Sequence, residues 1–171
     1  MDLNPPSLLM GLPSGLEGTR ATLGMMRDLA RAGSASTMVR QLAVSLTNNL
    51  PQKDWNSETN ALFTFVRDRI RYVKDVAGVE TLHTAERILQ NRSGDCDDKA
   101  ILLAALLKSI GHSVRFVACG FRDPNNCEHV FVETRPGNVG DWIALETTMP
   151  VPMGWSPLND KPPTKIIRVE V

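Results

Sequence analysis

The sequence predicts an α+β domain, with helices first along the chain and a sheet after them. The early segments carry helical signals and include one strongly apolar stretch, whereas the later segments are rich in β-branched and aromatic residues. With 171 residues, the chain is long enough to bury a core of its own. The expected helices cover residues 19–32, 37–49, 57–70, 81–91 and 95–110. The expected strands cover residues 112–120, 129–134, 141–148 and 165–171.

The N-terminal part of the chain is organised differently from the rest. Residues 1–16 are punctuated by proline and glycine and are expected to be extended. Gly33 and Pro51 are placed to end the first two helices. We therefore interpret residues 1–50 as an N-terminal helical arm and residues 51–171 as the main domain.

The helix expected at 95–110 has the strongest signals in the chain. Asp95 can cap it, Asp97 and Asp98 fall in its first turn, where the helix dipole favours anions, and Gly111 follows its end. Its body, AILLAALL, is apolar almost all round. Such a helix is expected to be central and buried rather than at the surface.

The composition argues against several classes of partner. The 19 basic and 19 acidic side chains give a net charge of zero, so we expect no nucleic-acid partner. No apolar run approaches the ~20 residues of a membrane helix, and the N-terminus lacks the basic start of a signal peptide. We therefore expect no membrane partner and a reducing, cytoplasmic location.

The cysteines predict neither a disulfide framework nor a metal centre. There are 3 of them, an odd number, and no C-x-x-C pair occurs. Cys119, Cys127 and His129 have suitable residue types for a metal but lack a fourth ligand and a convincing spacing. No metal and no cofactor is expected.

Cys96 is the candidate nucleophile because it lies at the start of the central helix. The positive end of the helix dipole lowers the pKa of a thiol, and the first backbone N–H groups can hold an oxyanion. Three neighbouring aspartates oppose this effect and would raise the pKa of the thiol. We expect a contact with an imidazolium to prevail, so that the pKa of Cys96 is lowered. The alternative is a small buried cysteine without a chemical role.

A base and an orienting acid can be assigned from strand pairing. If the two strands around residues 129–148 form a hairpin centred on Gly137 and Asn138, paired residues sum to 275 and His129 faces Glu146. A carboxylate beside an imidazole fixes its tautomer and stabilises its cation. Asp141 is the second candidate acid, but strand alternation points it to the opposite face. The alternative is an ordinary cross-strand polar pair.

The run GDCDDKAILLAALLKSIGHSVRFVACGF, followed by EHVFVET and DWIALETT, resembles the core of the transglutaminase-like cysteine peptidase superfamily, of the small bacterial or phage-encoded type. The resemblance covers roughly residues 57–148. It implies a papain-like α+β fold with a central buried helix packed on an antiparallel sheet. It also implies that Cys96 is the nucleophile, His129 the base and Glu146 the acid, where the family usually has aspartate. Gln90 is the candidate side-chain donor to the oxyanion.

The resemblance further implies a cysteine-dependent amide hydrolase or acyltransferase that works on a peptide or protein amide through a thioester. Water as acceptor would give hydrolysis or deamidation, and an amine would give transamidation. The rival interpretation is a phage virion or assembly adaptor that uses the same fold to bind phage structural proteins and is virion-associated. The arm methionines Met10, Met25, Met26 and Met38 would suit such a contact. Helices that merely cover their own core are the simpler explanation.

Overall fold

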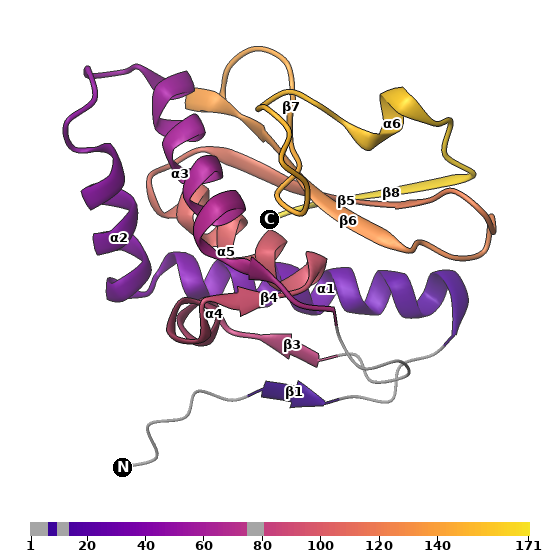
Figure 1. Ribbon diagram of the computed structural model, residues 1–171. Helices are drawn as coiled ribbons and strands as arrows, with labels where there is room; N and C mark the ends of the chain where they lie inside the picture. Colours follow the sequence, from indigo (N-terminus) through magenta and orange to yellow (C-terminus); the bar gives the residue numbers. More distant parts are fainter. Residues whose placement is uncertain (1–6, 10–13, 75–80) are drawn as a thin grey trace.

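The structure is a computed structural model that describes residues 7–9, 14–74 and 81–171 (Figure 1). The helices are α1 (Gly15–Ser34), α2 (Thr37–Thr47), α3 (Trp55–Arg69), α4 (Ala85–Asn91), α5 (Cys96–Ser109), the short α6 (Pro157–Asp160) and a 3₁₀ turn, η1 (Pro136–Asn138). The strands are β1 (Ser7–Leu9), β2 (Arg71–Tyr72), β3 (Thr81–His83), β4 (Ser93–Gly94), β5 (Ser113–Gly120), β6 (His129–Arg135), β7 (Ile143–Leu145) and β8 (Lys165–Glu170). Helices precede the main sheet, so the α+β prediction is confirmed.

The main sheet has the order β7-β6-β5-β8 and is antiparallel throughout. Its inner face, with Val114, Phe116 and Ala118, joins the large core around α5. Its outer face carries a smaller apolar cluster that includes Val117 and Phe131. The chain between β7 and β8, with α6, lies over this outer face (Figure 1). The sheet is therefore buried on both sides.

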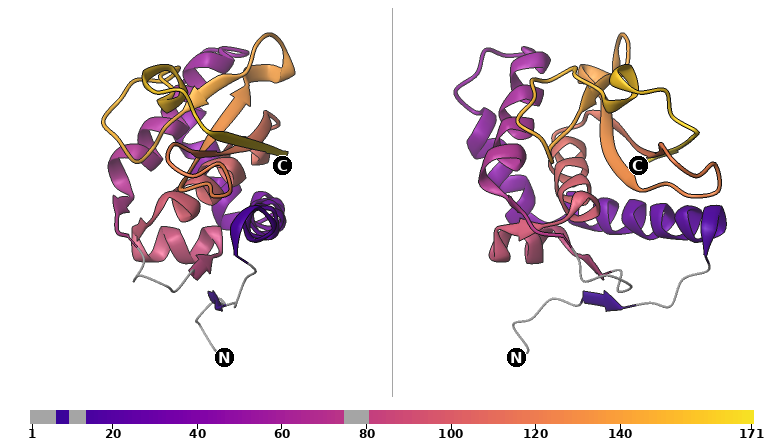
Figure 2. Two further views of the ribbon diagram at one scale, coloured as in Figure 1. Left: turned by 90° about the vertical axis from the view of Figure 1, so that its right-hand side faces the viewer. Right: turned by 45° about the vertical axis from the view of Figure 1, so that its right-hand side comes forward.

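Helix α5 lies at the centre, as predicted, with α1, α2, α3 and α4 around it and the sheet against it (Figure 2). Every residue from Asp98 to Leu107 is buried. The Asp95 side chain caps the helix by accepting a hydrogen bond from the backbone N–H of Asp98 at 3.1 Å. None of the helices in the described ranges is long and apolar enough to cross a membrane.

The predicted helix at 81–91 is wrong in its first part. Residues 81–83 form β3, which pairs antiparallel with β1, and α4 begins at Ala85. The physical reason lies in Thr84, whose hydroxyl accepts a hydrogen bond from the backbone N–H of Arg87 at 3.3 Å and so caps a shorter helix. Predictions for residues 1–6 and 10–13, including Met10, lie outside the described residues.

Helix α1 runs past Gly33, which was predicted to end it. Gly33 is buried inside the helix, and a Cβ atom there would lie 2.8 Å from Ala85 Cβ and 3.1 Å from Ala105 Cβ. The residue is thus glycine because α4 and α5 pack closely against it, not because the helix ends. Of the predicted contact methionines in α1 and α2, Met26 is buried in the core, Met25 is half-buried against the core, and Met38 is exposed.

Further boundaries differ from the predictions. Helix α1 begins at Gly15, four residues before the predicted start, so the end of the segment predicted to be extended is helical. Helix α3 begins at Trp55 rather than Ser57, because the Asp54 side chain accepts the hydrogen bond of Ser57 N–H and acts as the cap. The strand predicted at 141–148 is confined to β7, and the chain leaves the sheet before Glu146.

Candidate active site

Cys96 is the first residue of α5, directly after β4 and the capping residue Asp95. The residue at position 94 is glycine for a steric reason, because a Cβ atom there would lie 2.5 Å from the Cβ of Asp98. Asp98 in turn is held by His83, whose Nδ1 lies 2.8 Å from Asp98 Oδ2 and whose backbone N–H donates to Oδ1 at 3.1 Å. Glycine, a capping aspartate and a buried aspartate thus fix where the cysteine stands.

His129 and Glu146 are in contact, as the sequence predicts, although the register differs. His129 Nε2 lies 2.6 Å from Glu146 Oε2. The observed pairs, such as Val132 with Leu145, sum to 277 instead of 275. A shift of two residues preserves the face on which each side chain lies, so His129 and Glu146 meet diagonally and not directly opposite one another. The shift arises because η1 lengthens the turn, with Asn138 at φ 63°.

Glu146 is built to remain charged although it is completely buried. Its second oxygen, Oε1, accepts hydrogen bonds from the backbone N–H and the hydroxyl of Thr148, both at 2.7 Å. Burial alone raises the pKa of Glu146, but the hydrogen bond and charge of His129 and the two bonds from Thr148 bring it below the ordinary value. A buried carboxylate of this kind can stabilise an imidazolium.

The Cys96 thiol lies beside the start of β6, a part of the strand that does not pair with β7. Strand β7 pairs only with residues 132–134 of β6, so the start of β6 is unpaired on that side. The backbone of Val130 is within hydrogen-bond reach of the Cys96 sulfur, which places the thiol beside the residue that follows His129. Since His129 Nε2 is engaged by Glu146, Nδ1 is the ring nitrogen that can accept a proton.

The expected low pKa of the thiol is wrong. Burial raises the pKa of Cys96, the charges of Asp97 and Asp95 raise it further, and Val130 lowers it only in part. The thiol donates to Asp97 Oδ1, with a sulfur–oxygen distance of 3.6 Å. Sequence reasoning took the aspartates to be screened by solvent, whereas the site is enclosed enough for their charges to act. These surroundings favour the neutral form of the Cys96 thiol.

Two residues of this region were missed by sequence reasoning. Tyr72 of β2 pairs with Gly94 of β4 and is 46% exposed, and its pKa is raised by burial and by electrostatic interactions with Cys96, Asp95, Asp97 and Glu146. It is therefore an aromatic side chain within electrostatic range of the thiol. The pairing that brings it there is parallel and joins strands of two residues, which leaves no periodic signal in the sequence.

The second missed residue is Lys99, which lies one helical turn after Cys96. Lys99 is buried, with only 1% of its surface exposed. Its Nζ donates to the backbone carbonyls of Arg67 at 3.2 Å and Ile70 at 2.6 Å. Burial lowers the pKa of Lys99 to about 8, against the opposing charges of Glu146 and Asp68. Arg67 itself donates to the carbonyl of Val151 at 2.8 Å, in the segment after Glu146.

Other sequence-predicted residues are placed less closely. Gln90 is exposed in the last turn of α4, so its role as an oxyanion donor stays a prediction. Asp141 is exposed, and Glu146 rather than Asp141 contacts His129. Among the described residues, no group of three or more His, Cys, Asp or Glu side chains is placed to hold a metal ion.

These features were compared with known proteins. A family model described as the transglutaminase-like superfamily matches residues 40–147, more than half of the chain and a range that includes Cys96, His129 and Glu146. The chain belongs to the transglutaminase-like superfamily. The match begins within α2 and ends just after Glu146. A comparison with curated proteins gives no match.

Solved structures share the fold of this transglutaminase-like chain. A candidate protease from Parabacteroides distasonis superposes with a TM-score of 0.55 at 16% identity, over 77% of this chain and 27% of the other. A candidate cysteine protease from Cytophaga hutchinsonii gives 0.52 at 18%, over 78% and 48%. Calcium-bound LapG from Legionella pneumophila gives 0.51 at 18%, over 85% and 83%. The chain thus spans about a quarter and about half of the first two, and the likeness shows the fold alone.

Proposed function

We propose that this protein is a cysteine-dependent amide hydrolase or acyltransferase of the peptidase, deamidase or transglutaminase type. The observation that carries the proposal is the 2.6 Å contact between His129 and the buried Glu146, one residue before Val130, whose backbone contacts the thiol of Cys96. The family match and the candidate proteases among the structural neighbours support the same class of activity. The substrate would be a peptide or protein amide.

In the proposed reaction, the thiol proton of Cys96 passes to His129 Nδ1 as the sulfur attacks the amide carbonyl. The tetrahedral intermediate collapses when the C–N bond breaks and the imidazolium returns the proton to the leaving nitrogen, which yields a thioester and a free amine or ammonia. Water or an amine then attacks the thioester, and His129 again moves the proton. Glu146 holds the ring and stabilises its cation throughout.

The negative charge on the carbonyl oxygen needs donors during this reaction. The first N–H groups of an α-helix have no acceptor within the helix, so the backbone N–H of Cys96 is one proposed donor. The amide of Gln90 stays a second proposed donor. Because the resting thiol is neutral, His129 acts as a general base during attack instead of forming a stable ion pair beforehand.

The test is turnover by Cys96→Ala compared with Cys127→Ala, a matched change at a half-buried loop cysteine. Hydrolysis of fluorescein-labelled casein and incorporation of dansylcadaverine into dimethylcasein would be measured for the full chain. We expect Cys96→Ala to lose both activities completely and Cys127→Ala to retain them, with unchanged circular dichroism for both. Equal turnover of wild type and Cys96→Ala would refute the covalent mechanism.

The phage virion or assembly adaptor stays the alternative proposal. It is supported by two apolar side chains on α2, Met38 and Val44, which are 46% and 48% exposed. Helices α1 and α2 pack on α5 and share its core. We keep the division into an arm of residues 1–50 and a domain of residues 51–171 as a proposal. Absence of turnover by wild type, together with co-elution with phage structural proteins, would favour the adaptor.

A further inference from the structure

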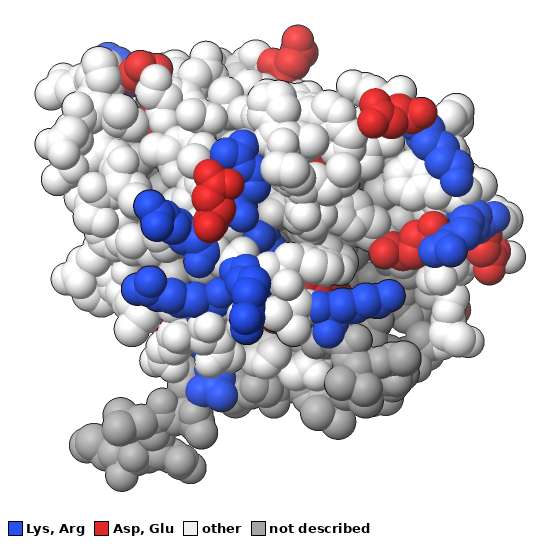
Figure 3. Space-filling view, in the orientation of Figure 1, with Lys and Arg blue, Asp and Glu red and all other residues white. Residues whose placement is uncertain are grey.

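Three arginines lie on the end of α3, on β2 and just before β4, the strand that leads to the proposed nucleophile. Arg69 lies at the end of α3, Arg71 begins β2, and Arg92 precedes β4, and all three are exposed. The net charge of the chain is zero, yet basic side chains outnumber acidic ones across the centre of the face seen in Figure 3. The local excess of positive charge is therefore a property of this surface and not of the whole protein.

The backbone brings two of these arginines together. Arg71 pairs with Ser93, and its backbone N–H donates to the carbonyl of Arg92 at 2.9 Å. Within the described ranges, Arg69, Arg71 and Arg92 have no carboxylate within ion-pair distance, whereas the nearby Arg67 contacts Asp68 at 2.7 Å. Arg69 interacts electrostatically with the neighbouring Asp68, whereas the charges of Arg71 and Arg92, on adjoining backbone positions, are suited to an external anion.

The position of this cluster relative to Cys96 follows from the parallel pairing of β2 and β4. Ser93, opposite Arg71, precedes Cys96 by three residues, which corresponds to about 10 Å of extended chain. Tyr72, opposite Gly94, lies between the arginines and the thiol and offers an exposed aromatic surface. An extended peptide that passes over Tyr72 would therefore meet the arginines about three residues from the bond under attack.

We propose that the substrate is a polypeptide with acidic residues about three positions from the amide that Cys96 attacks. This inference rests on the proposed function and specifies its substrate class. Guanidinium groups bind carboxylates with paired hydrogen bonds, and such contacts raise both the encounter rate and the specificity. A polypeptide is favoured over nucleic acid because the cluster is small, is joined to an aromatic surface and belongs to a chain without net positive charge.

The test measures binding, so that it does not depend on catalysis. The full-length Cys96→Ala protein would be titrated against fluorescein-labelled nonapeptides with a central glutamine in an alanine–glycine background. Two glutamates would stand three and four residues from the glutamine, on its N-terminal or its C-terminal side, and matched peptides would carry lysine instead. We expect one glutamate peptide to bind about ten-fold more tightly than its lysine counterpart, with the difference reduced by salt.

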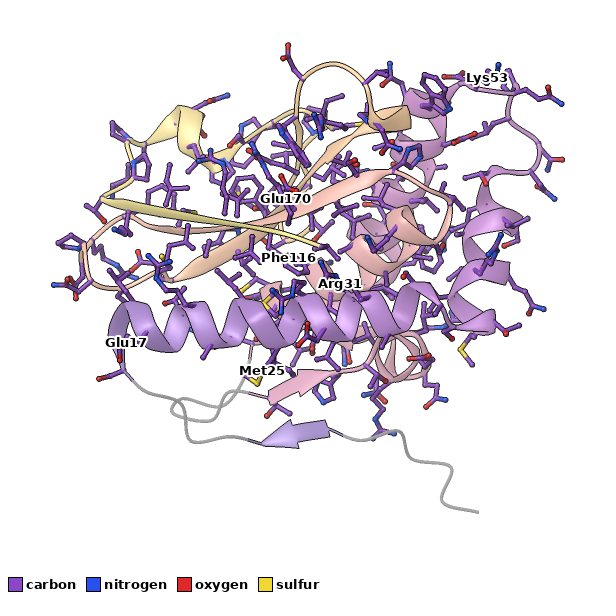
Figure 4. All side chains as sticks on the ribbon, turned by 180° about the vertical axis from the view of Figure 1, so that it is seen from behind. Glu17, Met25, Arg31, Lys53, Phe116 and Glu170 are labelled. Atoms are coloured by element: carbon purple, nitrogen blue, oxygen red, sulfur yellow. The ribbon has the colours of Figure 1, made fainter. Side chains whose placement is uncertain are left out.

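Variants then assign the preference to the cluster. Adding Arg71→Gln and Arg92→Gln should weaken binding of the glutamate peptide about three- to ten-fold. Arg31→Gln serves as the control, since Arg31 is an exposed arginine of α1 on the side of the molecule shown in Figure 4. Adding Arg71→Glu and Arg92→Glu should transfer the preference to the lysine peptide, an outcome that a misfolded variant could not produce.

Three results would overturn the inference. These are equal binding of glutamate and lysine peptides, unchanged preference in the charge-reversed variant, or displacement of the peptide by polyuridylate at a lower concentration than by the unlabelled peptide. The last result would identify a nucleic-acid surface. If wild type shows no turnover while the Cys96→Ala protein still prefers the glutamate peptide, the proposed function is refuted but the acidic-peptide site is not.

Discussion

Two histidine–carboxylate pairs lie near the first turn of α5, and a comparison of them separates a chemical role from a structural one. In both pairs the histidine side chain is 22% exposed and the carboxylate is almost completely buried. They differ in the second carboxylate oxygen. The second oxygen of Glu146 accepts a hydrogen bond from the backbone N–H of Thr148. Glu146 therefore contacts His129 only at the ring nitrogen Nε2. The second oxygen of Asp98 binds the backbone N–H of His83 itself, so the same carboxylate fixes both ring and backbone.

A buried His–acid pair is therefore not by itself evidence of catalysis. Asp98 connects β3 to α5 and occupies the space that Gly94 leaves, which is the role of a clamp. His129 instead begins β6, and the backbone of the following residue, Val130, contacts the Cys96 thiol. The neighbourhood, rather than the pair, distinguishes the two.

The largest expected contrast is between Glu146→Gln and Asp98→Asn. Glu146→Gln removes the charge that stabilises the imidazolium, so kcat/KM should fall about ten-thousand-fold with little change in stability. Asp98→Asn weakens a buried clamp, so the free energy of unfolding should fall by about 2–4 kcal/mol. Casein hydrolysis and urea unfolding would be measured for both. A stable Asp98→Asn protein with abolished turnover, or an unfolded Glu146→Gln protein, would reverse the assignment.

A smaller contrast concerns the two aspartates that flank Cys96, Asp95 and Asp97. Because burial and the charges of Asp97 and Asp95 raise the pKa of Cys96, the thiol is protonated at neutral pH. Its alkylation by iodoacetamide should therefore rise about tenfold per pH unit between pH 7 and pH 9. Asp97→Asn should accelerate alkylation about three- to ten-fold at each pH, because it removes a nearby negative charge.

Peptide mapping would follow the modification of Cys96 separately from that of Cys119, which is buried with a pKa raised to about 12. Asp28→Asn is the matched control, since Asp28 is an exposed aspartate of α1 and is not among the groups that raise the pKa of Cys96. A rate that is already at its plateau near pH 6 would show a preformed thiolate–imidazolium pair and contradict the neutral thiol.

The smallest expected effect is on stability in acid. The pKa of Glu146 is lowered in the folded protein, so its ionised form contributes stability above the ordinary value of 4.5, and this contribution is lost as the pH falls through the folded pKa. The free energy of unfolding of wild type should therefore decrease more steeply below pH 4.5 than that of Glu146→Gln. Chemical unfolding at several pH values tests this, and parallel curves for the two proteins would show that the pair is not ionised.

The sequence was sufficient where local chemistry decides the structure. Asp95 as a cap, the apolar body of α5 and strand alternation predict the central helix and the shared face of His129 and Glu146. Alternation survives an even shift, which is why the contact could be predicted although the register was wrong by two residues.

Prediction failed where the structure depends on residues far apart in the chain. The close packing of Ala85 and Ala105 on Gly33 has no local signal, and neither does the approach of Tyr72 to Gly94. The ionisation state of Cys96 depends on burial, which spacing does not report. The fold class was accessible from pattern alone, whereas the surroundings of the thiol required the tertiary structure.

The hydrogen bonds of Lys99 have a consequence for how the site opens. The amine ties α5 to the last turn of α3, and Arg67 of that turn ties α3 to Val151, downstream of Glu146. Three segments are thus joined through side chains that contact backbone carbonyls. Local unfolding of any one segment breaks its hydrogen bonds to the others. The end of α3, the start of α5 and the segment after Glu146 are therefore expected to unfold as one cooperative unit. We therefore expect local unfolding to expose the thiol in a single opening event and not through independent fraying of loops.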